Sequence, residues 1–449
     1  MNRLEIIEEI IKRSKEKDIE EIEIYVKQSS STEINIYEGN VENYFISDEE
    51  DLSLRGIYKG HMGYSYTEKL AKESIEELLE NLIQYAQNNE NEYIESMTET
   101  IDSFEKQDEK NLLDGYSDEQ KIEFLLDLEE KALAVSDKIK TISDCNYKEK
   151  TENIYIKNTL GLEVEETHTT AWISLGTVAE EDGNMQSAYS NLVIKDLTED
   201  LKDVLIREST GDALDMLGAE PISSGRYKVI LRNNVMADMM SYFLPVFSAS
   251  QVQKGLSLMK GKTGKTIGAP TLNMIEDPNL KEGAFNRSFD DEGTLTEKKH
   301  IIKDGILQTL LHSKKTAEKE GEVSTANGFR RSHKSSIEVI PTNIYLEEGS
   351  KSLDDLLKQM NEGIIITDIH GLHAGINPTS GDFALSSNGF LIENGSYKRP
   401  LEQITIAGNL YDMLKEIQEI GNDIKFSHPS SDYLGSPSIL ISGLSISGK

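Results

Sequence analysis

The pattern that most constrains the fold is an amphipathic helix followed by alternating strands, which occurs twice in the first half of the chain. In the first copy, isoleucines at helical spacing precede apolar and polar residues that alternate as in a strand. Turn residues such as Gly, Asn and Asp separate the strands. Consecutive strands joined by short turns pair antiparallel, so the pattern predicts an α+β fold with antiparallel or mixed sheets and flanking helices.

The strands and helices expected in the two units have the following residue ranges. Expected strands of the first copy are 22–26, 33–37, 41–46, 52–58 and 61–66, followed by a helix at 68–86. Those of the second copy are 139–144, 154–158 and 167–177, between helices at 118–135 and 196–217. We therefore predict an N-terminal α+β domain over residues 1–220, with sub-units 1–86 and 116–220 joined by the acidic segment 87–115.

The second half, residues 221–449, is predicted to form a larger, β-rich domain. Short helices are expected at about Leu353–Met360 and Leu410–Ile420. Composition changes at its start, since residues 221–275 contain seven Lys and Arg but one acid, Asp238. This segment is either an interior strand and helix or an interface for an acidic or extended partner, and the residues alone leave both interpretations open.

Net charge limits the class of partner. The chain carries 80 Asp and Glu against 47 Lys and Arg, a formal net charge of -33. Such a surface repels nucleic-acid backbones and anionic membranes, so neither is an expected partner. Cys145 is the one cysteine, which excludes an internal disulfide and fits a reducing compartment. Since no signal-peptide-like or membrane-spanning apolar run is found, we expect a cytoplasmic location.

Local motifs supply a few candidates for chemistry. GKTGKT at 261–266 lacks the first glycine of a phosphate-binding loop, because Met259 occupies that position. His370 and His373, with Asp368 nearby, could bind a metal only if Gly371 allows a turn, and turn histidines satisfied by the backbone are the alternative. FDDEG at 289–293 could hold a hard cation, although such a cluster more often opens a solvated turn.

Several blocks of the C-terminal half carry a resemblance to a known family. They are SFDDEGT at 288–294, KDGIL at 303–307, NGFRR at 327–331, SGDFALSSNGFLIENG at 380–395, ITIAGNL at 404–410, IGNDIK at 420–425 and the closing GSPSILISGLSISG. In order and spacing these blocks resemble the TldD/PmbA family of metalloprotease-related proteins, which are also called modulators of DNA gyrase. The resemblance implies a protease fold that acts on unfolded or leader-bearing peptides.

The resemblance also distinguishes two kinds of subunit. The TldD kind carries HExxxH on a helix and a late Cys, which hold zinc while the Glu acts as general base. Here the corresponding helix, within 233–260, has no His and no Glu, and the late segment KFSHPSSDYL has no Cys. The chain thus resembles the PmbA (TldE) kind, which implies no metal ligands and no catalytic residues of its own, and zinc in a TldD-like partner.

Our leading hypothesis is a non-metal-binding subunit that pairs with a TldD-like chain, or with itself as a homodimer, and contacts extended peptide substrates. Strand addition needs free backbone groups near a groove, and the glycine-rich block 370–410 is a place where it could occur. The groove candidates in that block are Gly381, Asp382, Phe383, Asn388 and Gly389. Two other hypotheses remain open: a stand-alone hydrolase with an unrecognised site, and a non-enzymatic peptide-binding or regulatory protein.

Overall fold

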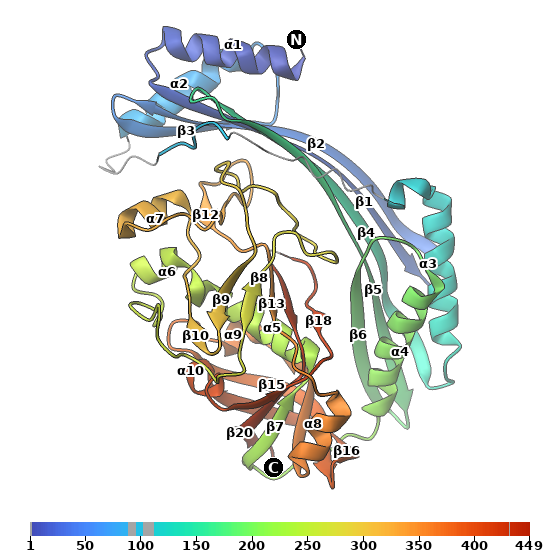
Figure 1. Ribbon diagram of the computed structural model, residues 1–449. Coiled ribbons are helices and arrows are strands. Elements are labelled where there is room, and N and C mark those ends of the chain that lie inside the picture. The colour runs from blue at the N-terminus through green and yellow to red at the C-terminus, as the bar shows by residue number, and fades with distance from the viewer. Residues whose placement is uncertain (1, 89–95, 102–111, 431) are drawn as a thin grey trace.

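A long curved sheet dominates the N-terminal half of the protein. The computed structural model describes residues 2–88, 96–101, 112–430 and 432–449. In these residues the strand order is β3-β2-β1-β4-β5-β6, and every pairing is antiparallel. The strands are β1 (Glu21–Tyr37), β2 (Asn40–Tyr58), β3 (His61–Thr67), β4 (Ile139–Asn158), β5 (Glu163–Glu181) and β6 (Asn184–Ile194). This sheet arches over the C-terminal half (Figure 1).

The strands of this sheet are longer than the sequence pattern predicted. β1, β2 and β4 run for 17, 19 and 20 residues, whereas the sequence predicted separate short pieces. The polar run at 28–33 stays in β1 because β2 and β4 pair with it on both sides. Backbone pairing therefore maintains the strand where the side chains give no alternating apolar pattern.

Helices cover the two ends of this sheet. They are α1 (Arg3–Glu16), α2 (Ser74–Asn88), α3 (Asp118–Leu133) and α4 (Glu199–Asp215). Two of them begin with a capping box, Asn2 with Glu5 for α1 and Ser117 with Gln120 for α3. α1 and α2 lie at one end of the sheet and α3 and α4 at the other (Figure 1). Separate apolar clusters form under the two ends.

Each predicted N-terminal sub-unit supplies three strands to this one sheet, β1–β3 from the first and β4–β6 from the second. Most of the acidic segment 87–115 lies outside the described residues. The domain boundaries given above stay predictions.

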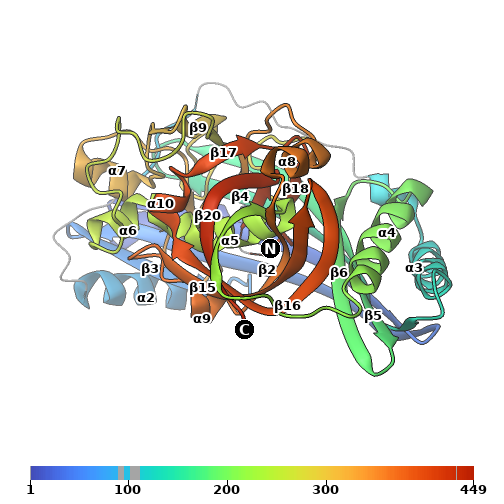
Figure 2. The ribbon, with the colours of Figure 1, turned by 90° about the horizontal axis from the view of Figure 1, so that it is seen from below.

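A small closed barrel forms the base of the C-terminal half (Figure 2). Its strand order is β16-β15-β14-β7-β20, and β16 also pairs with β20, which closes the ring. β17 (Ile417–Ile420) pairs with β20 at the side. The barrel strands are β7 (Gly225–Leu231), β14 (Gly363–His370), β15 (Asp382–Glu393), β16 (Ser396–Asn409) and β20 (Ile439–Ser447).

A second sheet accompanies the barrel, and helix α5 (Asn233–Phe243) contacts strands of both. The buried residues of α5 follow helical spacing, so the helix presents a wide apolar face to the core. The strands of the second sheet, in spatial order, are β10 (Ile306–Leu307), β9 (Lys299–Lys303), β8 (Met274–Glu276), β13 (Asn343–Leu346), β19 (Tyr433–Ser436) and β18 (Lys425–Phe426).

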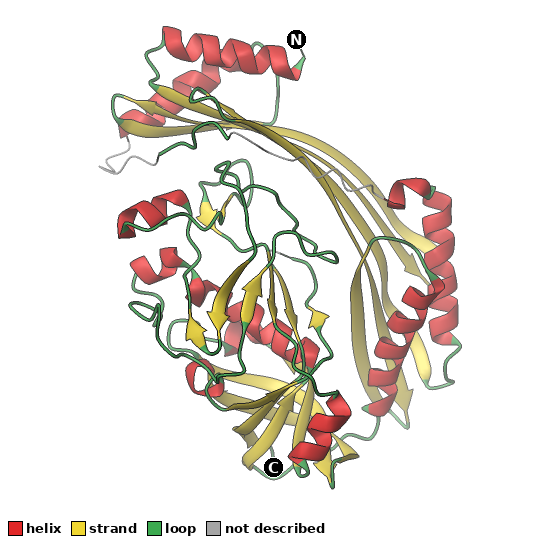
Figure 3. Cartoon of the chain, in the orientation of Figure 1, coloured by secondary structure: helices red, strands yellow, loops and turns green. Residues whose placement is uncertain are grey.

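The fold class is the predicted α+β class, with helices flanking sheets (Figure 3). One predicted helix is confirmed as α8 (Leu353–Met360). The helix predicted at Leu410–Ile420 is wrong beyond its first turn, because α10 ends at Met413 and β17 follows. Pairing of Ile417 and Ile420 with β20 outweighs the local helical pattern. No helix in the described residues is both long and apolar enough to cross a lipid bilayer.

Candidate functional site

A cavity of about 950 Å³ opens in the C-terminal half beside helix α5. One wall comes from α5 and the following α6 (Ala249–Gln253), and another from α7 (Lys314–Glu320). The remaining walls come from residues 336–341 and from residues that follow β18. The segment that would carry the metal-binding helix in a TldD-like chain and the segment that would carry its late Cys therefore meet at one cavity.

The cavity walls carry charges of both signs. The cations are Lys254, Lys315, Lys319 and Arg331, and the acids are Asp238, Glu338 and Asp432. Arg331 Nε and Glu338 Oε2 pair at 3.0 Å. With four cations against three acids the lining is close to neutral, so it repels acidic groups of a ligand less than the rest of a chain of net charge -33 does.

Asp238 is the acid that α5 places on the cavity wall. Burial, together with the nearby Asp368 carboxylate, raises the pKa of its carboxyl to about 7. The group therefore changes its protonation state near neutral pH, where it can donate a hydrogen bond or accept one.

His428 forms part of the opposite wall. Its ring meets the ring of Trp172 edge to face, with centroids 5.7 Å apart, so the cavity segment contacts strand β5 of the N-terminal sheet. Burial lowers the pKa of His428, and Lys148 adds to the decrease. The imidazole is thus held neutral over a wider pH range than an exposed histidine.

Residues 336–341 line the cavity as a continuous stretch. They include β12 (Glu338–Val339), which pairs with β11 (Gly328–Phe329) in a two-stranded sheet. No other strand of the described chain pairs with β12. An extended ligand could add to this short sheet through backbone hydrogen bonds.

The donor set of the cavity does not fit a zinc centre. In the described residues one group of three His, Cys, Asp or Glu side chains lies close enough to share a metal ion, namely Asp51, Glu68 and His333, and none of these lines the cavity. A zinc site needs three or four such donors converging on one point. The acids and the histidine of the cavity form no such group in the described chain.

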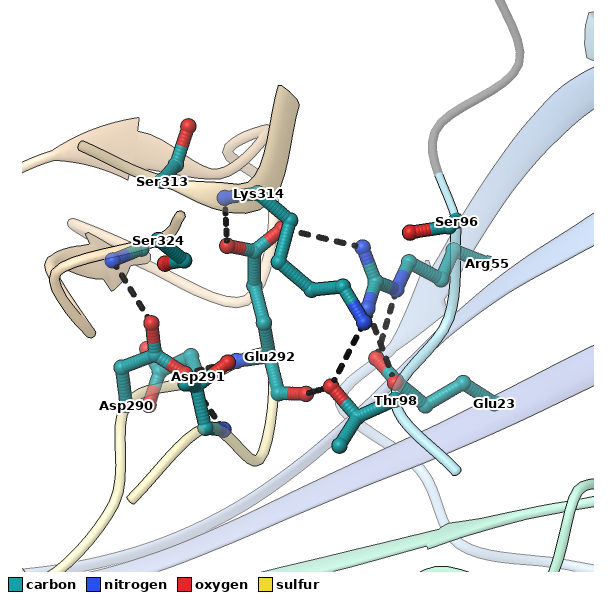
Figure 4. A network of polar contacts seen from close by, with 12 residues as sticks. Glu23, Arg55, Ser96, Thr98, Asp290, Asp291, Glu292, Ser313, Lys314 and Ser324 are labelled. Atoms are coloured by element: carbon teal, nitrogen blue, oxygen red, sulfur yellow. Dashed lines mark hydrogen bonds and ion pairs between the residues drawn. The ribbon is translucent and has the colours of Figure 1, made fainter. Parts of the chain in front are cut away.

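A buried ion network (Figure 4) reaches the backbone of Lys314, whose chain neighbours Ser313 and Lys315 line the cavity. Arg55 of β2 is fully buried and donates from Nε and Nη2 to the two carboxylate oxygens of Glu23 on β1, at 2.7 and 2.9 Å. Its Nη1 lies 3.5 Å from Glu292 Oε1, and Glu292 Oε2 accepts the backbone N–H of Lys314 at 2.7 Å. The network thus joins the N-terminal sheet to the start of α7.

The acidic motif FDDEG is buried, which corrects the expectation of a solvated turn. Asp290, Asp291 and Glu292 are at most 2% exposed. Asp290 accepts backbone N–H groups of Gly328, Glu292 and Thr294, and Asp291 pairs with Arg287 at 2.9 Å. Burial and the Glu292 carboxylate raise the pKa of Asp290 to about 8. These carboxylates organise the chain rather than face water.

Of the three alternative metal-ligand candidates, Asp368 and His370 lie close together, but among the described residues His373 does not join them in a three-ligand group. His370 Nε2 lies 3.1 Å from Asp368 Oδ2, and both side chains are about half exposed, at 57% and 46%. His373 lies in the short helix α9 (Leu372–Gly375) and joins no group of three ligands in the described chain. A metal at this place stays an untested alternative.

The predicted groove residues lie on or next to β15, away from the cavity. β15 pairs with β14 on one side and β16 on the other, so it has no free edge over most of its length. Phe383 is buried against Phe243, and a Cβ on Gly389 would come within 2.0 Å of the Ile365 carbonyl oxygen. Peptide contact by any of the five candidates, Gly381, Asp382, Phe383, Asn388 and Gly389, stays a prediction.

Sequence reasoning missed the wall formed by residues 336–341 and the lysines of α7. The NGFRR block at 327–331 precedes residues 336–341 in the chain. Nothing in the sequence of either stretch shows that α6 and α7 line the same cavity as residues 336–341. GKTGKT forms exposed turns and no helix follows it directly, in agreement with the weak nucleotide signal.

Comparisons with known proteins agree over nearly the whole chain. Models of the PmbA/TldA metallopeptidase family match in three parts: domain 1 at residues 22–86, the central domain at 111–217 and the C-terminal domain at 224–448. Metalloprotease PmbA of Escherichia coli O157:H7 is 30% identical over 254 residues, which cover 56% of this chain and 54% of that protein.

Two crystal structures share the fold. A Thermotoga maritima protein described as a candidate modulator of a DNA gyrase has a TM-score of 0.89 at 28% identity, covering 99% of this chain and 100% of that one. TldE from Thermococcus kodakarensis has a TM-score of 0.90 at 23% identity, with the same coverage, which shows the fold alone. With family models matched from the first sheet to the last strand, the chain belongs to the PmbA/TldD metallopeptidase family.

Proposed function

We propose that this chain is the PmbA/TldE-like, non-metal-binding subunit of a cytosolic TldD/TldE-type metalloprotease that processes unfolded peptides. In this proposal a TldD-like partner supplies the zinc, and this chain supplies cavity wall and peptide contacts. The observation that carries it is the cavity itself. It lies where the ligand-bearing segments of a TldD-like chain would meet, and its described donors do not converge on a metal.

The shape of the cavity supports a peptide ligand. Residues 336–341 border it with a two-stranded sheet in which β12 has one described strand partner, and Tyr242 of α5 is 41% exposed on the cavity lining. Extended peptides bind beside such strands through main-chain hydrogen bonds, with side chains in adjacent pockets. An exposed tyrosine supplies contact area at low cost in conformational entropy.

The first test compares the chain alone, the TldD-like partner alone and the two together. We expect zinc in the partner by elemental analysis, no chelator-sensitive peptidase activity in this chain alone, and cleavage of an unfolded test protein only in the mixture. Chelator-sensitive peptidase activity of this chain alone would overturn the proposal, as would full activity of the partner without it.

A second test concerns the peptide contact. Tyr242→Ala should weaken binding of an extended peptide to the assembled complex, measured by fluorescence anisotropy. Tyr37→Ala is the matched control, because Tyr37 is equally exposed at 42% but does not line the cavity. Equal effects of the two changes would argue against peptide binding at this cavity.

A further inference from the structure

His333 lies between two carboxylates at the junction of the two halves of the protein. It belongs to the connection between β11 and β12, whereas Asp51 lies on β2 and Glu68 follows β3. The distance from His333 Nδ1 to Asp51 Oδ2 is 2.9 Å, and that from His333 Nε2 to Glu68 Oε1 is 3.3 Å. The three residues offer ligand atoms within 4.8 Å of one another.

The two ring nitrogens have different surroundings. Asp51 is 14% exposed and accepts the Nδ1 proton, which leaves a lone pair on Nε2 in the neutral ring. Nε2 is shielded from water and faces Glu68 Oε1 at 3.3 Å. Its neighbour Glu68 Oε1 presents another lone pair, so a positive centre between the two atoms would turn a repulsion into an attraction.

The separation of these atoms matches two ligands of one metal ion. Ligands at roughly 2.1 Å from a metal, with bond angles between roughly 90° and 109°, lie roughly 3.0–3.4 Å apart. The observed 3.3 Å falls in this interval. A metal-bound histidine also commonly donates its other ring N–H to a carboxylate, which fixes the ring and raises its basicity. Asp51 occupies that position.

We propose that His333 and Glu68 bind a divalent transition metal such as Zn²⁺ or Co²⁺, with Asp51 orienting the imidazole. Water would fill the remaining positions, so this would be a weaker and more open site than a zinc centre held by three or four residues. Imidazole nitrogen with a carboxylate oxygen suits this class of metal. The ion would tie the connection between β11 and β12, which carries cavity-lining Arg331, to the N-terminal sheet. This site is separate from the cavity. The proposed function denies a metal to the cavity only, so the two proposals are independent of each other.

Lys334 allows a test that separates metal binding at this site from binding elsewhere. Its Nζ lies 2.6 Å from Glu68 Oε1, the same oxygen that faces His333, and its side chain is 51% exposed. The ammonium group and the metal compete for this carboxylate. Lys334→Ala should therefore tighten metal binding, whereas loss of a ligand should weaken it.

The test titrates metal-free, full-length protein with Co²⁺ and follows visible absorption and binding heat. We expect one site lost or weakened by about 10- to 100-fold in His333→Ala and in Glu68→Gln. His373→Ala should leave the titration unchanged, and Lys334→Ala should lower the dissociation constant. Circular dichroism establishes that each variant is folded.

Two outcomes would overturn the inference. One is a titration that His333→Ala leaves unchanged, which would assign the bound ions to the acidic surface at large. The other is weaker binding in Lys334→Ala. A second readout is tryptic cleavage after Arg331 in wild-type protein, which metal should slow, and equal cleavage rates with and without metal would contradict the proposed tie.

Discussion

The buried ion network and the cavity lie side by side but use charge in opposite ways. Around Arg55 the charged groups are fully buried, and Glu23 and Glu292 surround the guanidinium. Along the cavity, Lys254 is exposed and Asp238 is half-buried. Charges of the first kind connect the two halves of the chain, whereas charges of the second kind remain available to a ligand. Stability should therefore depend on the network and binding on the cavity.

Arg55→Ala should have the largest effect, because it leaves two buried carboxylates without this cation. We expect a loss of about 3–5 kcal/mol in the free energy of unfolding, measured by urea denaturation. Lys131→Ala removes a cation from exposed pairs with Asp127 and Glu199 and should change stability far less. Similar losses in both variants would remove the distinction between the two regions.

Gly328→Ala tests the network through its packing. A Cβ at this position would lie 2.3 Å from Glu292 Oε2, so the carboxylate or strand β11 must move. We expect a loss of about 1–3 kcal/mol by thermal or urea unfolding. Gly211→Ala, at a helical position with no atom within 4 Å, should be neutral or slightly stabilising. Unchanged unfolding stability in Gly328→Ala would show that the Glu292 side chain can move away from the new Cβ without losing its contacts.

Asp238→Asn should raise stability at alkaline pH, in contrast to the network variants. The folded-state pKa of about 7 lies above the ordinary value of 3.8, so the wild-type protein loses stability as pH rises through this interval. The Asn variant lacks this titration. We expect an advantage of about 1–2 kcal/mol at pH 8 that is absent near pH 4, by urea unfolding.

Asp203→Asn, at an exposed position of α4, is the control for this titration. Its stability difference from wild type measures the effect of replacing an exposed aspartate outside the cavity. An Asp238→Asn variant that behaves in the same way would show that the cavity carboxyl is fully solvated.

Lys254→Ala should have the smallest effect, limited to binding. It removes one exposed cation from the cavity, so an acidic peptide should bind about two- to fivefold more weakly at low salt, with little change at high salt. Unfolding should not change. Lys281→Ala, with a 91% exposed side chain outside the cavity, should leave binding as it is. Peptide anisotropy at two salt concentrations measures both.

The sequence predicted the fold class and the order of most N-terminal elements, because apolar periodicity reports which face of an element is buried. The prediction from sequence was wrong where pairing with neighbouring strands determines the secondary structure. Examples are the polar stretch 28–33, which continues β1, and the segment that forms β17 in place of a helix. For the site, residue types alone showed that the segments matching the HExxxH helix and the late Cys carry other residues. The wall at 336–341 was not, because contacts between distant segments determine which residues face a cavity.

Burial of the FDDEG motif was also beyond local reasoning. Adjacent carboxylates usually remain in water. Here Arg55 and the backbone N–H of Gly328, both distant in sequence, together with the neighbouring Arg287, make their burial possible. His333 was overlooked for a similar reason, since its two carboxylate neighbours lie more than 250 residues earlier in the chain.

The closure of the C-terminal barrel has a consequence for synthesis. β7, the first barrel strand, pairs with β20, the last strand of the described chain, and β20 also completes the ring through β16. During translation β7 can pair with β14 first, but it must wait for more than 200 residues before its other neighbour, β20, emerges from the ribosome. A chain truncated by a premature stop would expose two open strand edges, which chaperones and proteases recognise as unfinished protein.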